Sequence, residues 1–191
     1  MKNVLLVFIT CLSFQVFGQV EQANLLGQWS DDSLVGSAIF DNTYNEIWGL
    51  AVDGREYAVI GSTLGTHFID VTDPSNPVEI HIVEGAVTGP SIIHRDYHDD
   101  GCFLYVVADE PTNPNVPELS TLQIIDVSGL PESVEVVYDS DELFFRAHNI
   151  FIDEPNDRLY AFIANGGGVS FSAMRVYDIS CLLYTSDAAD E

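Results

Sequence analysis

Three segments of this chain share one short pattern, in which hydrophobic residues surround an aspartate at a fixed place. They are Phe68–Val71 (FIDV), Ile124–Val127 (IIDV) and Val176–Ile179 (VYDI). The aspartates, Asp70, Asp126 and Asp178, follow one another at intervals of 56 and 52 residues. Repetition at roughly 40–50 residues, with several strands in each unit, is typical of propeller blades.

Each unit divides into short strands separated by turn signals. In the first unit, Ile47–Val52 leads into Asp53-Gly54, a dipeptide typical of a tight hairpin turn. Unbroken apolar runs such as Tyr105–Ala108 indicate strands buried on both faces, and no apolar period of 3.6 extends over a helix length. The sequence therefore predicts an all-β fold, a partial β-propeller of about three four-stranded blades. We expect these blades at residues 44–84, 91–139 and 145–180, with an N-terminal closing strand at Asn24–Ser30.

The two ends of the chain differ from the repeats. Lys2 and the apolar run Val4–Phe14 are typical of a secretory signal peptide, so we expect cleavage after residue 18. The run is too short for a membrane span. Residues 181–191 resemble the in-frame translation of a transposase sequencing adapter, so we expect the natural repeat to continue beyond Ser180 and the propeller domain to occupy residues 19–180.

The chain is strongly acidic, with 30 aspartates and glutamates against 6 lysines and arginines and a formal net charge of −24. Such a surface repels nucleic acids and anionic membranes, which excludes both as partners. Two explanations of the acidity stay open: a solvated, salt-tolerant surface, or clustered carboxylates that bind a divalent cation. The loops Asp99–Asp100 and Asp139–Glu142 offer oxygen ligands for Ca²⁺, although neither has the spacing of a known calcium loop.

The first strand of a propeller blade lines the central channel, so its polar side chains are candidates for ligand binding. The candidates are His94, Asp96, His98, His148 and Asn149. Imidazoles and carboxylates that meet in a channel could hold Zn²⁺ or another transition metal, or the histidines could hydrogen-bond backbone groups between blades. His94 and His98 lie about 13 Å apart along a strand, too far to chelate one ion directly. We expect His67 and His81 on the surface.

The repeated aspartates have a structural explanation. Asp70, Asp126 and Asp178 each follow an apolar strand and precede a turn that contains serine or threonine, so each carboxylate can cap nearby backbone N–H groups. Ser-His-Asp catalysis finds no support, because the chain has no Gly-x-Ser-x-Gly motif. No catalytic residue is therefore predicted.

The chain resembles the LVIVD-repeat proteins, and within them the surface group called choice-of-anchor B. The resemblance covers about residues 24–180 and includes the three repeated strands, the turn Asp70–Pro77 and the segment Ala147–Ile150. It implies an exported bacterial β-propeller with a C-terminal anchor that varies between members. It implies no established biochemical activity.

Three functional hypotheses follow. The leading one is a secreted or cell-surface binding or adhesion module without enzymatic activity, whose partner is an extracellular protein or a glycan. The alternative is a hydrolase or lyase that uses His94, His98 and His148 in the channel, with or without a metal. The third is a protein whose structure is stabilised by Ca²⁺.

Overall fold

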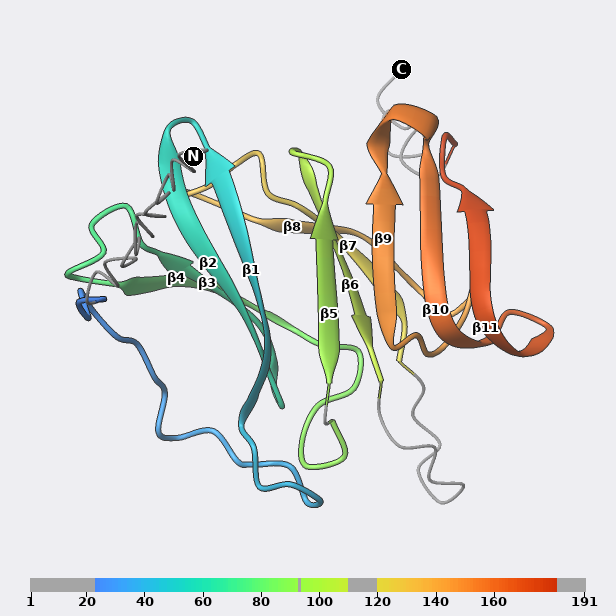
Figure 1. The fold of residues 1–191 in the computed structure, drawn as a ribbon, viewed down its shortest axis with the longest axis horizontal. Helices are drawn as coiled ribbons and strands as arrows, with labels where there is room; N and C mark the ends of the chain where they lie inside the picture. The colour runs from blue at the N-terminus through green and yellow to red at the C-terminus, as the bar shows by residue number, and fades with distance from the viewer. Residues whose placement is uncertain (1–22, 93, 110–119, 182–191) are drawn as a thin grey trace, which may run out of the picture.

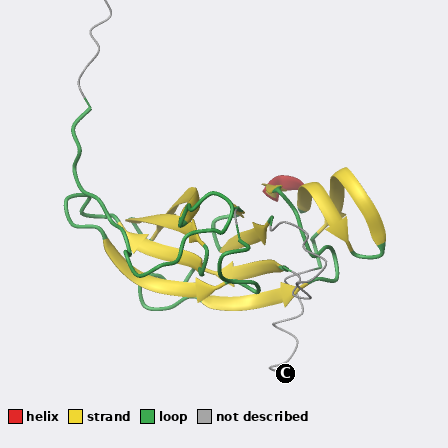
Figure 2. Cartoon of the chain, turned by 90° about the horizontal axis from the view of Figure 1, so that it is seen from below, coloured by secondary structure: helices red, strands yellow, loops and turns green. Residues whose placement is uncertain are grey.

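The computed structural model describes residues 23–92, 94–109 and 120–181. Within these ranges the protein is all-β, with eleven strands and one short 3-10 helix, η1 (Glu154–Asn156), the red segment in Figure 2. No helix in the described part of the chain is long and apolar enough to cross a membrane. The expected signal peptide at residues 1–18 and most of the segment 181–191 lie outside the described ranges.

Three antiparallel sheets follow one another along the chain, and consecutive strands pair within each (Figure 1). The first sheet consists of β1 (Tyr44–Val52), β2 (Arg55–Ser62), β3 (Gly65–Asp70) and β4 (Val78–Glu84). The second consists of β5 (Arg95–Asp99), β6 (Phe103–Ala108), β7 (Leu122–Asp126) and β8 (Glu135–Ser140). The third consists of β9 (Asn149–Asp153), β10 (Arg158–Gly166) and β11 (Val169–Asp178).

The turn between β1 and β2 shows how the sequence determines the local structure. Asp53 and Gly54 have φ angles of 48° and 77°, both in the left-handed region. Two such residues form the hairpin turn whose twist matches that of the flanking strands, and glycine adopts this backbone without a steric penalty. The turn sets the register that pairs Val52 with Arg55 and Leu50 with Tyr57.

Two hydrophobic cores lie between the three sheets. The core between the first and second sheets contains Leu50, Tyr57, Val59, Phe68, Tyr97, Leu104, Val106 and Ile125. The core between the second and third sheets contains Tyr105, Val107, Leu122, Ile124, Ile150, Ile152, Leu159 and Ala161. Successive residues of β6 therefore enter opposite cores, which explains the unbroken apolar run at Tyr105–Ala108. Each fully buried side chain of this size contributes roughly 1.5–3 kcal/mol.

Among the described residues, the third sheet is covered on one face only. Its other face carries Phe151, Met174 and Val176, which are all exposed. The register pairs Tyr160 with both Phe151 and Val176, so these side chains form one continuous apolar row across the sheet. In the second sheet, by contrast, side chains on both faces are buried.

The N-terminal segment does not form the expected closing strand. Residues 24–30 contain no strand, and no backbone hydrogen bond among those described joins them to a sheet. Leu25 and Leu26 are exposed, whereas the ring of Trp29 packs on Tyr44 at a centroid distance of 5.8 Å. A strand needs a hydrogen-bonding neighbour, and in the described structure this segment is attached by side-chain packing instead. Its role in closing a last blade stays a prediction.

Candidate functional site

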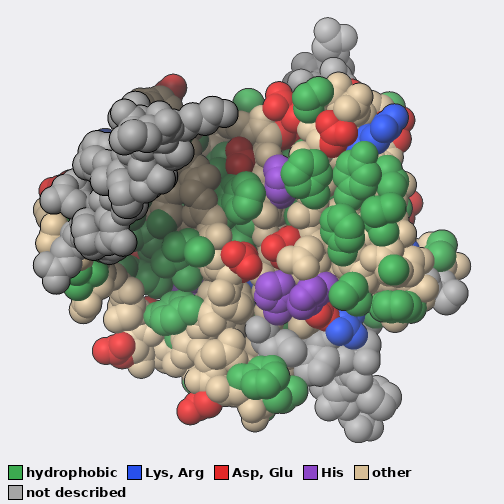
Figure 3. Space-filling model, in the orientation of Figure 1, with side chains coloured by type: hydrophobic (Ala, Val, Ile, Leu, Met, Phe, Trp, Pro, Cys, Tyr) green, Lys and Arg blue, Asp and Glu red, His purple; other side chains and the backbone are tan. Residues whose placement is uncertain are grey.

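The first strands of the three sheets lie side by side, with β5 between β1 and β9 (Figure 1). Because each sheet contributes one of these strands, side chains more than a hundred residues apart in the chain meet on one face. Histidine and acidic side chains gather near the middle of this face (Figure 3). We call the surface formed by β1, β5 and β9 the inner-strand face.

One group of three potential metal ligands lies on the inner-strand face. Glu46 on β1, His94 just before β5 and Asp96 on β5 bring one ligand atom each within 4.8 Å of one another. Among the described residues, this is the group of at least three such side chains that are close enough to hold one metal ion. The Nε2 atom of His94 is buried and has no hydrogen-bond partner among the described residues.

The carboxylate of Asp96 is positioned by the neighbouring strand β9. Its Oδ1 accepts a hydrogen bond of 3.0 Å from the side-chain amide of Asn149, and its Oδ2 accepts one of 2.6 Å from the backbone N–H of Ile150. Burial raises the pKa of Asp96 above its usual range, and the nearby Glu46 carboxylate adds to this effect, whereas the two hydrogen bonds oppose it. Asp96 therefore links the second and third sheets at the centre of the face.

His148 and Asp109 form a second polar pair beside this group. His148 Nδ1 lies 2.5 Å from Asp109 Oδ2, and Arg146 forms an ion pair with the other oxygen of the same carboxylate. The ring of His148 stacks on the ring of His94, with centroids 4.5 Å apart. A carboxylate next to Nδ1 fixes the orientation of an imidazole and leaves Nε2 available as a base or ligand.

His98 has a different environment, although it projects from the same face of β5. Its ring packs between Trp48 and Phe151, at centroid distances of 4.9 Å and 4.7 Å. Its Nδ1 lies 3.0 Å from the backbone carbonyl of Asp99. The structure thus brings His94, Asp96, His148 and Asn149 together in one polar cluster and places His98 in a row of aromatic rings beside it.

The three repeated aspartates lie away from this cluster and make the same contact in each sheet. The Oδ1 atoms of Asp70, Asp126 and Asp178 accept hydrogen bonds of 3.0, 2.8 and 3.0 Å from the backbone N–H two residues further along. Each bond closes the turn that follows the third strand of its sheet. These aspartates therefore belong to the scaffold of the repeat.

In the two acidic segments named as calcium candidates, Asp99 and Asp100 bind the hairpin turn between β5 and β6, and Asp139 binds a side chain of the neighbouring strand β7. Asp99 accepts hydrogen bonds from Trp48 Nε1 at 2.7 Å and from the N–H of Gly101 at 2.9 Å. Asp100 accepts a bond of 2.8 Å from the N–H of Phe103. Asp139 accepts a bond of 3.0 Å from the side chain of Gln123. The carboxylates of Asp99, Asp100 and Asp139 are thus held by hydrogen bonds to other protein groups.

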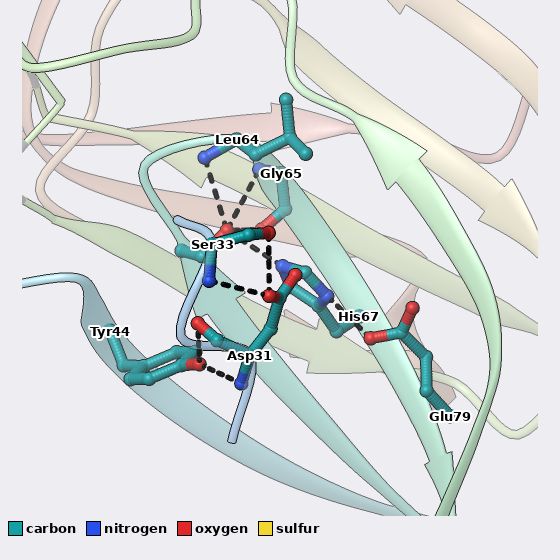
Figure 4. A network of polar contacts seen from close by, with 8 residues as sticks. Asp31, Ser33, Tyr44, Leu64, Gly65, His67 and Glu79 are labelled. Carbon is teal, nitrogen blue, oxygen red and sulfur yellow. Dashed lines mark hydrogen bonds and ion pairs between the residues drawn. The ribbon is translucent and has the colours of Figure 1, made fainter. Parts of the chain in front are cut away.

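The first sheet contains a chain of hydrogen bonds that sequence reasoning missed (Figure 4). Ser62 Oγ lies 2.7 Å from His67 Nε2, and His67 Nδ1 lies 2.9 Å from the Glu79 carboxylate. A hydroxyl, an imidazole and a carboxylate in this order have the arrangement of a serine hydrolase triad. The expectation that His67 lies on the surface is wrong, because its side chain is 1% exposed.

Burial and additional contacts argue against a catalytic role for Ser62. Its side chain is fully buried, and its Oγ accepts hydrogen bonds of 3.0 and 3.2 Å from the N–H groups of Leu64 and Gly65. The ring of Trp29 packs on His67 at a centroid distance of 5.3 Å. A nucleophile must reach its substrate, whereas this hydroxyl caps the turn between β2 and β3. The trio is therefore a structural network in which the serine and the histidine are buried.

Sequence reasoning also missed three members of the inner-strand cluster. Glu46 precedes the first apolar strand that the sequence indicated, and Asp109 and Arg146 lie in segments between the expected strands. A usable signal existed for Asp109, since it directly follows the buried strand β6 at the end nearest the cluster. No such local signal distinguishes Glu46 or Arg146 from other charged residues.

Comparison with known proteins finds no family model, no curated protein and no solved structure that matches this chain. The chemistry of the site therefore has to be inferred from its own residues. The inner-strand face offers two kinds of group: a cluster of imidazole, carboxylate and amide side chains, and an adjacent row of aromatic rings.

Proposed function

We propose that this protein is an exported, secreted or cell-surface β-propeller of the LVIVD-repeat type that binds a glycan on its inner-strand face. The observation that carries the binding role is the convergence of polar side chains from three successive sheets. Glu46 comes from the first sheet, His94 and Asp96 from the second, and His148 and Asn149 from the third. Such convergence is typical of binding sites, where a few polar groups fix the orientation of a ligand.

The equivalent positions of the three sheets support a propeller. Val59, Tyr105 and Tyr160 lie at matching places in β2, β6 and β10, because each pairs with the residue two before the repeated aspartate of its sheet. Val59 and Tyr105 are buried against the following sheet, whereas Tyr160 belongs to the apolar row with Val176 on the exposed face of the third sheet. In a propeller, Tyr160 and Val176 pack against a further blade, because each repeat buries its faces only between neighbours. Phe151 lies at the inner end of the row, where its ring contacts His98.

Export is supported by the N-terminal sequence. A basic residue followed by a short apolar run and a small residue is the pattern of a secretory signal peptide. The acidity of the chain also suits a protein that remains soluble outside the cell without binding anionic surfaces. These features favour a location at the cell surface or in the medium.

A glycan suits the inner-strand face better than the other candidate partner, an extracellular protein. Trp48, His98 and Phe151 form a row of rings next to the carboxylate and amide of Asp96 and Asn149. Sugars present both apolar C–H faces, which pack on rings, and hydroxyl groups, which hydrogen-bond carboxylates and amides. Protein interfaces, in contrast, have few charged residues at their core.

The glycan proposal is tested with the full chain and a panel of immobilised neutral and acidic polysaccharides. Phe151→Ala removes a ring that is 50% exposed on the inner strand β9, and we expect at least about tenfold weaker binding, or roughly 1.4 kcal/mol. Phe171→Ala is the matched control, since it removes a ring that is 62% exposed on the outermost strand β11. No binding to any polysaccharide, or equal losses in both variants, would contradict the proposal.

The His148–Asp109 pair favours a second candidate function, a hydrolase or lyase acting at the same face. A carboxylate that orients an imidazole is the arrangement of a general base, and the distance of 2.5 Å is suitable for it. Turnover of polysaccharide or ester substrates that disappears in His148→Ala would support this function. Absence of turnover across both panels would remove it.

A further inference from the structure

We propose that Glu46, His94 and Asp96 bind one divalent transition-metal ion, such as Zn²⁺ or Mn²⁺. The site joins the first and second sheets, because Glu46 lies on β1 whereas His94 and Asp96 belong to the start of β5. It depends on these three side chains and holds whether or not a glycan binds to the same face.

The donor atoms have suitable chemistry and spacing. One imidazole nitrogen and two carboxylate oxygens lie within 4.8 Å of one another. Zinc binds such atoms at about 2.0–2.2 Å, which places neighbouring donors of a tetrahedral site roughly 3.4 Å apart. Small side-chain rotations of the three residues therefore close the site around an ion.

The buried nitrogen of His94 is an independent indication of a ligand. Nε2 is shielded from solvent, yet it has no hydrogen-bond partner within the described ranges. Buried polar atoms are almost always satisfied, and each exception needs an explanation. With the proton on Nδ1, the lone pair of Nε2 is available to a metal ion.

The surroundings of the three ligands orient them as metal sites require. The amide of Asn149 and the N–H of Ile150 hold the Asp96 carboxylate, and the ring of His148 stacks on His94. Such outer contacts fix the direction of ligands and are a regular part of metal centres. They come from the segment around β9, so the third sheet supports a site whose ligands belong to the first two.

The local charge also calls for a cation. Glu46 and Asp96 place two carboxylates next to one imidazole, and two negative charges at this separation repel each other. The nearby guanidinium of Arg146 is bound to Asp109, and that of Arg95 donates to the carbonyl oxygens of Ser62 and Val87. A divalent ion neutralises the two carboxylates directly.

The ligand set selects the class of metal. An imidazole ligand suits zinc and other transition metals, whereas Ca²⁺ and Mg²⁺ prefer sites made of oxygen alone. Three protein ligands leave a coordination position open for water or for a hydroxyl group of a bound molecule. The proposal therefore specifies a transition metal in place of the calcium considered from the sequence.

The test is a titration of the chelator-treated full chain with Zn²⁺, and separately with Mn²⁺, followed by calorimetry. We expect one saturable site in the wild type and at least about tenfold weaker binding in Glu46→Gln and in His94→Gln. His98→Gln is the matched control, because this histidine lies on the same strand but packs between Trp48 and Phe151. Circular dichroism and thermal melts identify any variant that fails to fold, in which case the other ligand variant decides.

The outcomes separate the metal site from glycan binding. One saturable site that is lost in the two ligand variants and kept in His98→Gln supports the metal site, even if no polysaccharide binds. Absence of saturable binding of either ion to the wild type overturns it, even if a polysaccharide binds. Unchanged affinity in both ligand variants, or an equal loss in the control, also overturns it.

Discussion

Asp70, Asp178 and Asp96 lie in two kinds of electrostatic environment. The pKa of Asp70 lies below its usual range chiefly because Arg55 donates a hydrogen bond to its carboxylate, and that of Asp178 is lowered by the hydroxyl and N–H of Ser180. Burial instead raises the pKa of Asp96, which is 8% exposed on the inner-strand face. The surroundings of Asp70 and Asp178 thus favour the charged form, whereas Asp96 is held in a place that disfavours it.

This difference predicts an unusual pH dependence for Asp96. The folded protein retains the Asp96 proton to a higher pH than the unfolded chain, whose pKa is near the ordinary 3.8. Stability associated with the protonated form is therefore lost as the pH rises from about 4 through the raised pKa. Asparagine does not ionise, so Asp96→Asn does not lose this stability. In metal-free protein, the melting temperature of the variant minus that of the wild type should therefore increase from pH 4 to pH 7.

Thermal melts across this range check the prediction, with Asp178→Asn as the control. The pKa of Asp178 is lowered in the folded protein, so the stability that its ionised form contributes is already complete above about pH 4. The difference between this variant and wild type should therefore stay flat from pH 4 to pH 7. A flat or falling difference for Asp96→Asn would show that its ionisation does not oppose folding.

At the scale of secondary-structure elements, the hairpin between β1 and β2 carries part of the site. Its turn at Asp53-Gly54 sets the register of β1, and β1 places Glu46 and Trp48 on the inner-strand face. Gly54 has a φ of 77°, yet a Cβ atom at this position would meet no atom within 4 Å. A substitution here therefore changes the backbone preference alone, without a steric clash.

Gly54→Ala should lower the free energy of unfolding by about 1–2 kcal/mol, the cost of a left-handed backbone for a residue with a side chain. Gly49→Ala is the matched control, because Gly49 lies on β1 with equally open space but without a positive φ. We expect its effect to stay within about 0.5 kcal/mol. Denaturant unfolding of both variants measures the difference, and equal effects would mean that the turn does not determine the hairpin's stability.

Local signals in the sequence were sufficient for much of this architecture. The Asp53-Gly54 turn, the doubly buried run at Tyr105–Ala108 and the absence of a helical period are properties of short windows, and they gave the all-β fold. The opening strands likewise indicated His94 and His148, which the structure stacks against each other. These features depend on neighbours in the chain, so they can be read without coordinates.

The remaining features depend on contacts between distant segments. His67 is buried because Ser62, Glu79 and the ring of Trp29 surround it, and nothing in its local pattern distinguishes it from a surface residue. Glu46 joins His94 only because β1 and β5 lie side by side. Residues 24–30 have a strand-like pattern, and in the described structure no neighbouring strand pairs with them.

At the scale of the whole molecule, the second sheet holds the structure together. It contributes to both hydrophobic cores, and its strand β5 contacts both β1 and β9. These cores must also withstand electrostatic repulsion, since 30 acidic residues face only 6 basic ones. Two of the arginines form ion pairs with carboxylates in the described structure, Arg55 with Asp70 and Arg146 with Asp109. Most of the negative charge is left for solvent and counterions to screen.

The net charge of −24 predicts that simple salt stabilises the protein. Raising NaCl from about 0.02 M to about 0.5 M shortens the screening length from roughly 20 Å to roughly 4 Å, which weakens repulsion between carboxylates. The melting temperature should rise, by roughly 2–4 °C for each kcal/mol gained. The control measures Glu46→Gln in MgCl₂ of equal ionic strength, because this variant lacks one ligand of the proposed metal site. A similar rise in its melting temperature shows that screening, and not ion binding at the inner-strand face, stabilises the protein. A melting temperature that falls or stays constant in NaCl would mean that the carboxylates lie too far apart for repulsion to affect folding.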